Sequence, residues 1–281
     1  MKVGLSVIVL AVAAFAADAA ERKSFEVRPR AFYEATFRAR VAEGPTLEKD
    51  PQLAEAVSLT VGRPSVLTGR PFAYVQWTFG GGSDGKRPSN GSAPFMLYSG
   101  EWKSFTYRFY APDGATQVAP KVVNGKGVRG EIADVVVREL PPSAMLIPHP
   151  GFDDSLAAPG WQLKSGAQYC VDKDGPFVMM EGASVASDIF PVEPGQRLEV
   201  VVTGEAPRFS ATSRTNARLT YYAGSDDLAK KNGGTMVPEA ASVIRDMEPV
   251  GRRSYTVPEG MRWASVSVWN GSVRRVEVTA K

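Results

Sequence analysis

The sequence has few of the residues that carry most enzyme chemistry. Its 281 residues include one histidine, His149, and one cysteine, Cys170. A nucleophilic relay needs a base that titrates near neutral pH, and His149 lies between two prolines with no evident partner. Zinc sites need several His or Cys ligands. The sequence therefore predicts a protein that is not an enzyme and has no zinc centre, and a lone cysteine excludes an intrachain disulfide.

Dense blocks of one charge sign are also missing. The net charge is +3, and the arginines pair up only as Arg252-Arg253 and Arg274-Arg275. Proteins that bind nucleic acid usually gather Lys and Arg on one face or along one helix. Two short pairs are more typical of solvated strand edges, so no nucleic-acid partner is predicted.

Only one long apolar run is present, from Leu5 to Phe15. It is shorter than the roughly 20 residues that a membrane-spanning helix needs. Lys2 precedes it, and a small-x-small site, Ala17-Asp18-Ala19, follows it. This arrangement predicts a cleaved signal peptide over residues 1–19, no membrane span, and a secreted or periplasmic protein.

Helix signals are scarce in the rest of the chain, and one short helix is predicted, over Leu47–Val57. Elsewhere, short runs of Val, Phe, Tyr, Thr and Trp alternate with Gly, Pro, Asn and Asp, which is typical of an all-β sandwich or barrel. Pro141-Pro142 cannot extend a strand ladder, so the predicted domains are residues 21–140 and 143–281. Alternation in the first domain predicts these core residues: Val75, Trp77, Phe79, Phe105, Tyr107 and Phe109.

One pattern occurs in both domains. Residues 107–125 read YRFYAPDGATQVAPKVVNG, and residues 253–271 read RSYTVPEGMRWASVSVWNG. Without a gap, Pro112 matches Pro258, Gly114 matches Gly260, and Asn124 matches Asn270. The pattern predicts two related modules, each with a strand, a turn, a second strand and a closing strand. The second domain has an opening segment from residue 149 to 161 that the first lacks, so the first is predicted to expose a sheet edge.

The second domain resembles a known family. Its opening PGFDD at residues 150–154 is followed by Pro-Gly-Trp at 159–161, by a Phe-x-Val-x-Pro-Gly strand entry at 190–195, and by the Pro-acidic-Gly turn. These segments resemble cellulase-associated carbohydrate-binding modules of the galactose-binding-like, jelly-roll family. The resemblance implies two tandem jelly-roll β-sandwiches and non-catalytic carbohydrate binding.

The same resemblance suggests which residues would form a structural calcium site. In the family, an acid of the opening segment and an acid of the last strand help to hold a structural ion. The matching residues are Asp153 in the second domain and Asp134 in the first. Each domain retains only one of the two acids, and Arg274-Arg275 replaces the last-strand acid in the second domain. Structural calcium is therefore disfavoured, and no cofactor is predicted.

The best lead to a ligand site is the strand that ends at Trp269. Alternation places Ala264, Val266 and Val268 on one face, which suits a core. The opposite face then offers indole rings for sugar stacking and short hydroxyl groups for hydrogen bonds. Together with a neighbouring strand, it gives the predicted ligand-binding residues Trp263, Ser265, Ser267, Trp269, Tyr222 and Arg218.

Three alternatives stay open at this point. The two tryptophans could pack in the core or between the domains, because tryptophan is commonly buried. The whole protein could be a structural or interaction module of a cell-surface or periplasmic assembly, with a cell-surface protein as its partner. A hydrolase would need two acids across one bond, but the adjacent acids of Asp153-Asp154 and Asp226-Asp227 point to opposite faces if they lie on strands.

Overall fold

The computed structural model describes residues 23–50, 72–81, 95–152, 159–163, 166–205, 215–224, 242–244 and 250–281. The predicted signal peptide and Asp153 lie outside these residues. Of the predicted helix, residues 47–49 form a single turn, in which the N–H groups of Lys49 and Asp50 donate to the Thr46 carbonyl. The remainder of that predicted helix, from residue 51, is outside the described residues.

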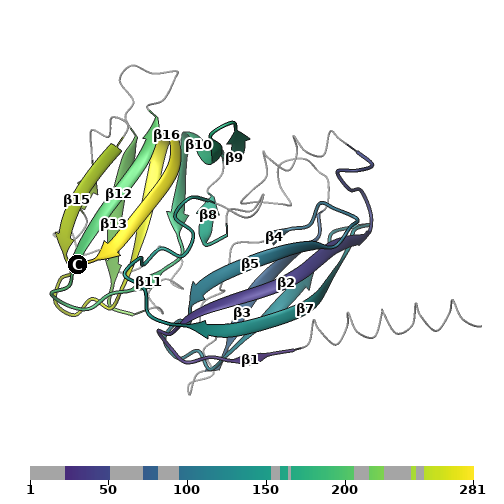
Figure 1. Cartoon of the computed structure of the whole chain (residues 1–281), viewed down its shortest axis with the longest axis horizontal. Helices are drawn as coiled ribbons and strands as arrows, with labels where there is room; N and C mark the ends of the chain where they lie inside the picture. Colours follow the sequence, from purple (N-terminus) through teal and green to yellow (C-terminus); the bar gives the residue numbers. More distant parts are fainter. Residues whose placement is uncertain are drawn as a thin grey trace, which may run out of the picture.

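The fold is all-β, as predicted, with two sandwiches in tandem (Figure 1). The first sandwich consists of two sheets packed face to face. The strand order is β1-β6-β3-β4 in one sheet and β5-β2-β7 in the other. Its strands are β1 (Phe25–Glu26), β2 (Phe32–Glu43), β3 (Tyr74–Gly80), β4 (Phe95–Met96), β5 (Lys103–Tyr110), β6 (Gln117–Val123) and β7 (Arg129–Leu140).

The nine described strands of the second sandwich form one continuous hydrogen-bonded sheet, because β10 and β16 each take part in both of its layers. The early half of β16 pairs with β13 and with the end of β10, and its late half pairs with β12 and with the start of β10. The strands are β8 (Trp161–Leu163), β9 (Ala167–Asp172), β10 (Gly175–Ser187), β11 (Phe190–Pro191), β12 (Arg197–Glu205), β13 (Asn216–Tyr222), β14 (Ser242–Ile244), β15 (Val250–Thr256) and β16 (Trp263–Ala280).

Left-handed residues mark the corner where the long strands pass from one sheet to the other. In β16, Asn270 and Gly271 have φ values of 61° and 71°, and Gly182 in β10 has 63°. Glycine adopts such φ values without strain, and asparagine tolerates them better than most residues. The Asn-Gly pair of the sequence repeat thus bends β16 at the sandwich corner.

The strand pairings repeat between the two sandwiches. β2 lies between β5 and β7, as β12 lies between β15 and the late half of β16. β3 pairs with β4 and β6, as β13 pairs with β14 and the early half of β16. The matched turns agree as well, because Gly114 and Gly260 have φ values of 75° and 76°. Within the described residues, the first sandwich has no counterparts of β8, β9 and β10.

The core of the first sandwich is aromatic, and every residue predicted for it is buried. Phe37 stacks on Phe105 with ring centroids 5.3 Å apart and meets Trp77 edge-on at 5.6 Å. The second core is mostly aliphatic, with valines of β10, β12 and β16 at its centre. Each large apolar side chain buried in this way contributes about 1.5–3 kcal/mol.

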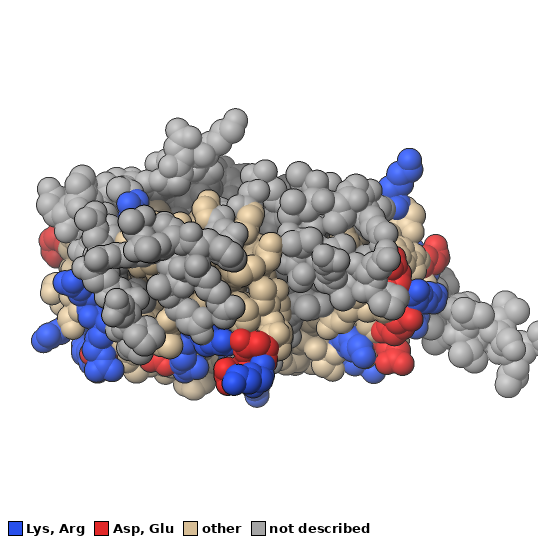
Figure 2. All heavy atoms as spheres, turned by 90° about the horizontal axis from the view of Figure 1, so that it is seen from above, with Lys and Arg blue, Asp and Glu red and all other residues tan. Residues whose placement is uncertain are grey.

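The faces that these sheets turn outward carry mixed charge. Figure 2 shows acidic and basic side chains side by side along the lower rim of the molecule. Ion pairs account for much of this pattern in the first sandwich, where both Arg108 and Arg138 bind Glu34. In the part of the chain that the structure describes, no helix has the length and hydrophobicity needed to cross a membrane.

Candidate ligand-binding face of the second sandwich

The alternation predicted for the start of β16 is present. Ala264, Val266 and Val268 are fully buried between the sheets of the second sandwich. Trp263, Ser265, Ser267 and Trp269 occupy the opposite face of the strand, but this face is not uniformly open. Its two ends have different surroundings and different roles.

The expectation that Trp263 lies on an exposed face is wrong. Its side chain is 0% exposed, and its Nε1–H donates to Asp113 Oδ2 of the first sandwich at 2.6 Å. The guanidinium of Arg30, also from the first sandwich, lies 5.3 Å from the ring. Strand alternation identifies which residues share a face, but it cannot show that another domain covers that face. Trp263 therefore fixes the junction between the sandwiches.

The neighbours of Trp263 on this face are buried as well. Ser265 is 6% exposed and Tyr222 is 8% exposed, and their hydroxyl groups lie 3.2 Å apart. These two predicted site residues satisfy each other's hydrogen-bonding groups in a buried position, which is the usual arrangement for polar side chains inside a protein. They are unavailable to a ligand in this structure.

The other end of the face remains accessible. Trp269, Ser267 and Arg218 are each partly exposed, and the Arg218 guanidinium lies 5.4 Å from the Trp269 ring. Three of the six predicted site residues thus come together as the alternation requires.

Two more polar residues join this group through the strand register. Trp269 of β16 lies directly opposite Asn216 of β13 on one side and Ser184 of β10 on the other. In the next row, Ser267 lies between Arg218 and Ala186. Side chains directly opposite each other have Cβ atoms about 4.5–5.5 Å apart, so these rows form one surface. Asn216 and Ser184 were not predicted, because their positions depend on a cross-strand register that the sequence does not give.

We name this surface the Trp269 face, made of Ser184, Asn216, Arg218, Ser267 and Trp269. Its centre is an aromatic ring, and its surroundings carry hydroxyl, amide and guanidinium groups. Such a surface can stack an apolar ring face and hydrogen-bond to hydroxyl groups at the ring's edge.

The junction holds the other polar groups that could carry chemistry. His149 is buried, with 2% of its surface exposed. Its Nε2 accepts a hydrogen bond from the Arg108 N–H at 2.9 Å, and its carbonyl accepts one from Trp161 Nε1 at 2.7 Å. Nearby in the chain, Tyr107 donates its hydroxyl proton to Asp188 Oδ2 at 3.0 Å. These contacts join the two sandwiches.

Asp188 makes the stability of this junction depend on pH. Burial raises the pKa of Asp188 to about 6, although the hydrogen bond from Tyr107 opposes the shift. The folded protein therefore binds this proton more tightly than the unfolded chain, and the free energy of unfolding falls as pH rises from about 4 to about 6. Above about pH 6, the ionisation of Asp188 no longer changes the free energy of unfolding.

An Asp188→Asn variant, which can still accept the Tyr107 hydrogen bond, is expected to lose this pH dependence. Relative to wild type, its free energy of unfolding should gain about 1–3 kcal/mol between pH 4 and pH 8. Urea denaturation at each pH measures the difference. Parallel pH profiles for the two proteins would contradict the account of Asp188.

Of the two metal-binding residues suggested by the family resemblance, only Asp134 is among the described residues. Asp134 is exposed, has a φ of 53°, and pairs its Oδ2 with the Arg38 guanidinium, with Nε at 2.6 Å. Asp153 lies outside the described residues. Arg274, in the last strand of the second sandwich, pairs with Asp172 at 2.6 Å. Among the residues described, no three His, Cys, Asp or Glu side chains form a group suited to a metal ion.

No protein-family model matches the chain. No curated protein matches it in sequence. Similar solved structures include the tandem CBM22 domains of Paenibacillus barcinonensis Xyn10C, at 11% identity and a TM-score of 0.33, over 92% of this chain and 82% of that one. Another is the CBM22-1–GH10 part of Clostridium thermocellum xylanase 10B, at 12% identity and a TM-score of 0.30, over 49% and 28%. A structure of carbohydrate-binding modules of the β-sandwich superfamily covers 75% of this chain and 84% of its own, at 14% identity and a TM-score of 0.27.

Proposed function

We propose that this chain is an exported, non-catalytic protein that binds carbohydrate through the Trp269 face of its second sandwich. The observation that carries the proposal is the row Asn216–Trp269–Ser184, with Arg218 beside the Trp269 ring. A partly exposed indole with hydrogen-bonding groups on both sides suits a ligand that has one apolar face and many hydroxyl groups.

The proposal differs from the sequence-based prediction in the extent of the site. Trp263, Ser265 and Tyr222 are excluded because their side chains are buried. The site therefore has one stacking ring instead of two, and Asn216 and Ser184 are added to it. A single-ring platform suits a short oligosaccharide or a chain end better than a long run of stacked sugar units.

The polar residues with unusual environments support binding over catalysis. Asp188 has a raised pKa, which is a common property of catalytic acids. However, it lies in the junction, where its carboxylate accepts a hydrogen bond from Tyr107. Its role there is to connect the sandwiches.

Export is proposed from the signal-peptide pattern of residues 1–19.

The test is a broad oligosaccharide array probed with the purified protein, followed by titration of the strongest ligands while tryptophan fluorescence is recorded. We expect saturable binding and a change in indole emission, because stacking on Trp269 removes water from its ring. A folded, monodisperse sample that binds no glycan would refute the proposal.

A further inference from the structure

In the part of the chain that the structure describes, the first sandwich has an unpaired strand edge where the matching edge of the second is paired. Among the described residues, β7 pairs with β2 on one side and with no strand on the other. In the second sandwich, the matching edge of β16 is occupied by residues 144–150. Leu146 N–H donates to the Val278 carbonyl at 2.8 Å, and Val276 N–H donates to the Pro150 carbonyl at 2.8 Å.

The strand register shows which residues correspond. Val137 of β7 lies opposite Ala35 of β2, and Val278 of β16 lies opposite Val200 of β12. Ala35 also lies opposite Tyr107, and Val200 lies opposite Arg253. Tyr107 matches Arg253 in the repeat, so Val137 matches Val278. Beside Val278, Leu146 and Ile147 are buried in the core. Beside Val137, the structure has a pocket.

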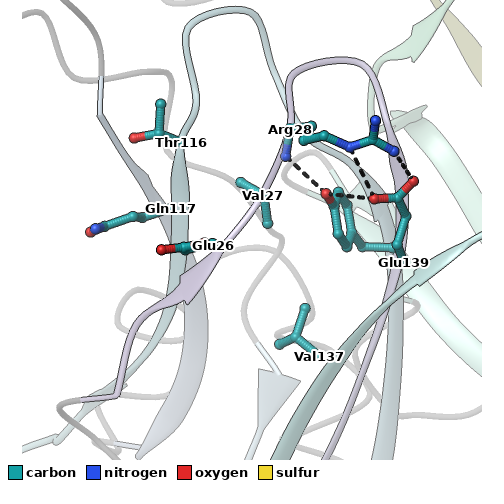
Figure 3. A pocket seen from close by; sticks show the side chains of 8 residues that line it. Glu26, Val27, Arg28, Thr116, Gln117, Val137 and Glu139 are labelled. Atoms are coloured by element: carbon teal, nitrogen blue, oxygen red, sulfur yellow. Dashed lines mark hydrogen bonds and ion pairs between the residues drawn. The ribbon is translucent and has the colours of Figure 1, made fainter.

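The pocket has a volume of about 580 Å³ and opens between β1 and β7 (Figure 3). Its apolar lining comes from Val27 and Val137, one from each sheet of the sandwich. Arg28 binds Glu139 and receives support from Tyr33, whose hydroxyl accepts from the Arg28 N–H at 2.8 Å. Arg28, Tyr33 and Glu139 also line the pocket, in which Val137 is partly exposed and Val27 is buried.

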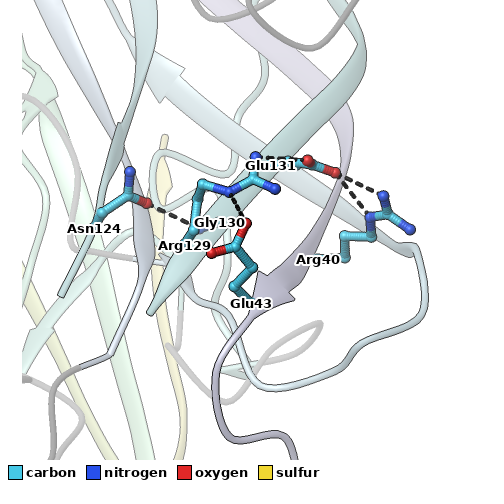
Figure 4. Close-up of polar contacts among 6 residues, drawn as sticks. All are labelled: Arg40, Glu43, Asn124, Arg129, Gly130 and Glu131. Carbon is cyan, nitrogen blue, oxygen red and sulfur yellow. Dashed lines mark hydrogen bonds and ion pairs between the residues drawn. The ribbon is translucent and has the colours of Figure 1, made fainter. Parts of the chain in front are cut away.

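The rest of β7 is fixed in place, so the open edge is presented by a well-supported strand. Arg129 pairs with both Glu43 and Glu131, and Arg40 also binds Glu131 at 2.7 Å (Figure 4). Asn124 Oδ1 accepts a hydrogen bond from the Gly130 N–H at 2.9 Å. These contacts connect β7 to β2 and to the turn after β6. An exposed strand edge of this kind is a template for pairing with another chain.

We propose that the β7 edge of the first sandwich binds an extended segment of a partner protein, with an aliphatic pair like Leu146-Ile147 entering the pocket between Val27 and Val137. The second sandwich shows the chemistry of the occupant, since its own segment fills the matching place. The described residues of the first sandwich contain no equivalent segment. This proposal concerns the first sandwich and does not depend on carbohydrate binding by the second.

A labelled peptide with the sequence of residues 143–151, SAMLIPHPG, is a direct probe. We expect it to bind the purified protein and to protect the backbone amides of residues 135–139 from hydrogen exchange. A peptide with aspartate in place of both Leu146 and Ile147 should not bind. In the protein, Val137→Asp should weaken binding at least tenfold, while Val171→Asp, at a valine that is 65% exposed on β9, should leave it unchanged.

The exchange measurement on unaltered protein keeps the test valid if Val137→Asp fails to fold. Absence of peptide binding would overturn the proposal, as would protection at residues 276–280 instead of 135–139, because the peptide would then be replacing the protein's own segment. Strong protection, before any peptide is added, of the amides of residues 135, 137 and 139, which face away from β2, would also overturn it. Light scattering that shows a dimer dissolved by Val137→Asp would reassign the edge to a second copy of the chain.

Discussion

Replacing Trp263 with alanine is expected to lower the free energy of unfolding by about 3–5 kcal/mol, the usual range for removing a fully buried Trp or Phe from a core. The indole is completely buried at the junction of the two sandwiches. The variant also removes the hydrogen bond from Trp263 Nε1–H to Asp113 Oδ2, which is 2.6 Å long. It removes the contact between the indole ring and the Arg30 guanidinium as well. Denaturant unfolding followed by far-ultraviolet circular dichroism measures the loss.

Trp102 provides the matched control. It is a partly exposed tryptophan of the first sandwich, flanked by Arg38 and Arg40 at 5.5 Å and 4.7 Å from its ring. Trp102→Ala should cost about 1 kcal/mol, because little apolar surface is returned to water. If Trp263→Ala costs no more than Trp102→Ala, the junction does not depend on Trp263 as described.

Substitution of Trp269 is expected to weaken ligand binding and to change stability little, in contrast to substitution of Trp263. Trp269→Ala should weaken binding of the best oligosaccharide by about 30-fold, which corresponds to about 2 kcal/mol for loss of a central aromatic anchor. Its stability should change little by comparison, because the ring is only partly buried. Titration calorimetry gives the affinity, and the unfolding experiment gives the stability.

Two variants separate stacking from hydrogen bonding on the Trp269 face. Trp269→Phe retains an aromatic ring and should recover part of the affinity, whereas Asn216→Ala removes an amide on one side of the ring and should cost less than Trp269→Ala. Equal affinity of wild type and Trp269→Ala for the same oligosaccharide would move the site elsewhere.

Most of the fold could be predicted from the sequence repeat. Matching Pro112 with Pro258 and Gly114 with Gly260 placed the same turn in both domains, and both glycines have the left-handed φ that this turn requires. The sequence also predicted that the first domain lacks an opening segment, and its described strands include no counterparts of β8, β9 and β10. The short helix predicted from Leu47 begins instead with a single turn, since one proline and a few polar residues are a weak helix signal.

The site was only half predictable because two kinds of information are absent from a strand pattern. Alternation put Trp263 and Trp269 on one face correctly, but it contained nothing about Asp113, which is 150 residues away and covers one of them. Asn216 and Ser184 reach Trp269 only through pairing between distant strands. The repeat positions one turn in each domain, but the register between distant strands also depends on bulges and on the corner at Asn270, which local sequence does not position.

The most direct test of the Trp269 face is an indole NMR spectrum of the protein with isotope-labelled tryptophan, recorded during titration with the best oligosaccharide. The chain has five tryptophans, so each Nε1–H signal can be assigned by single substitution. We predict that the Trp269 signal shifts with saturation, while the signals of the buried Trp77, Trp161 and Trp263 stay in place. A titration in which Trp269 is unmoved while Trp102 shifts, or in which no indole shifts despite binding, would contradict the assignment of the ligand to this face.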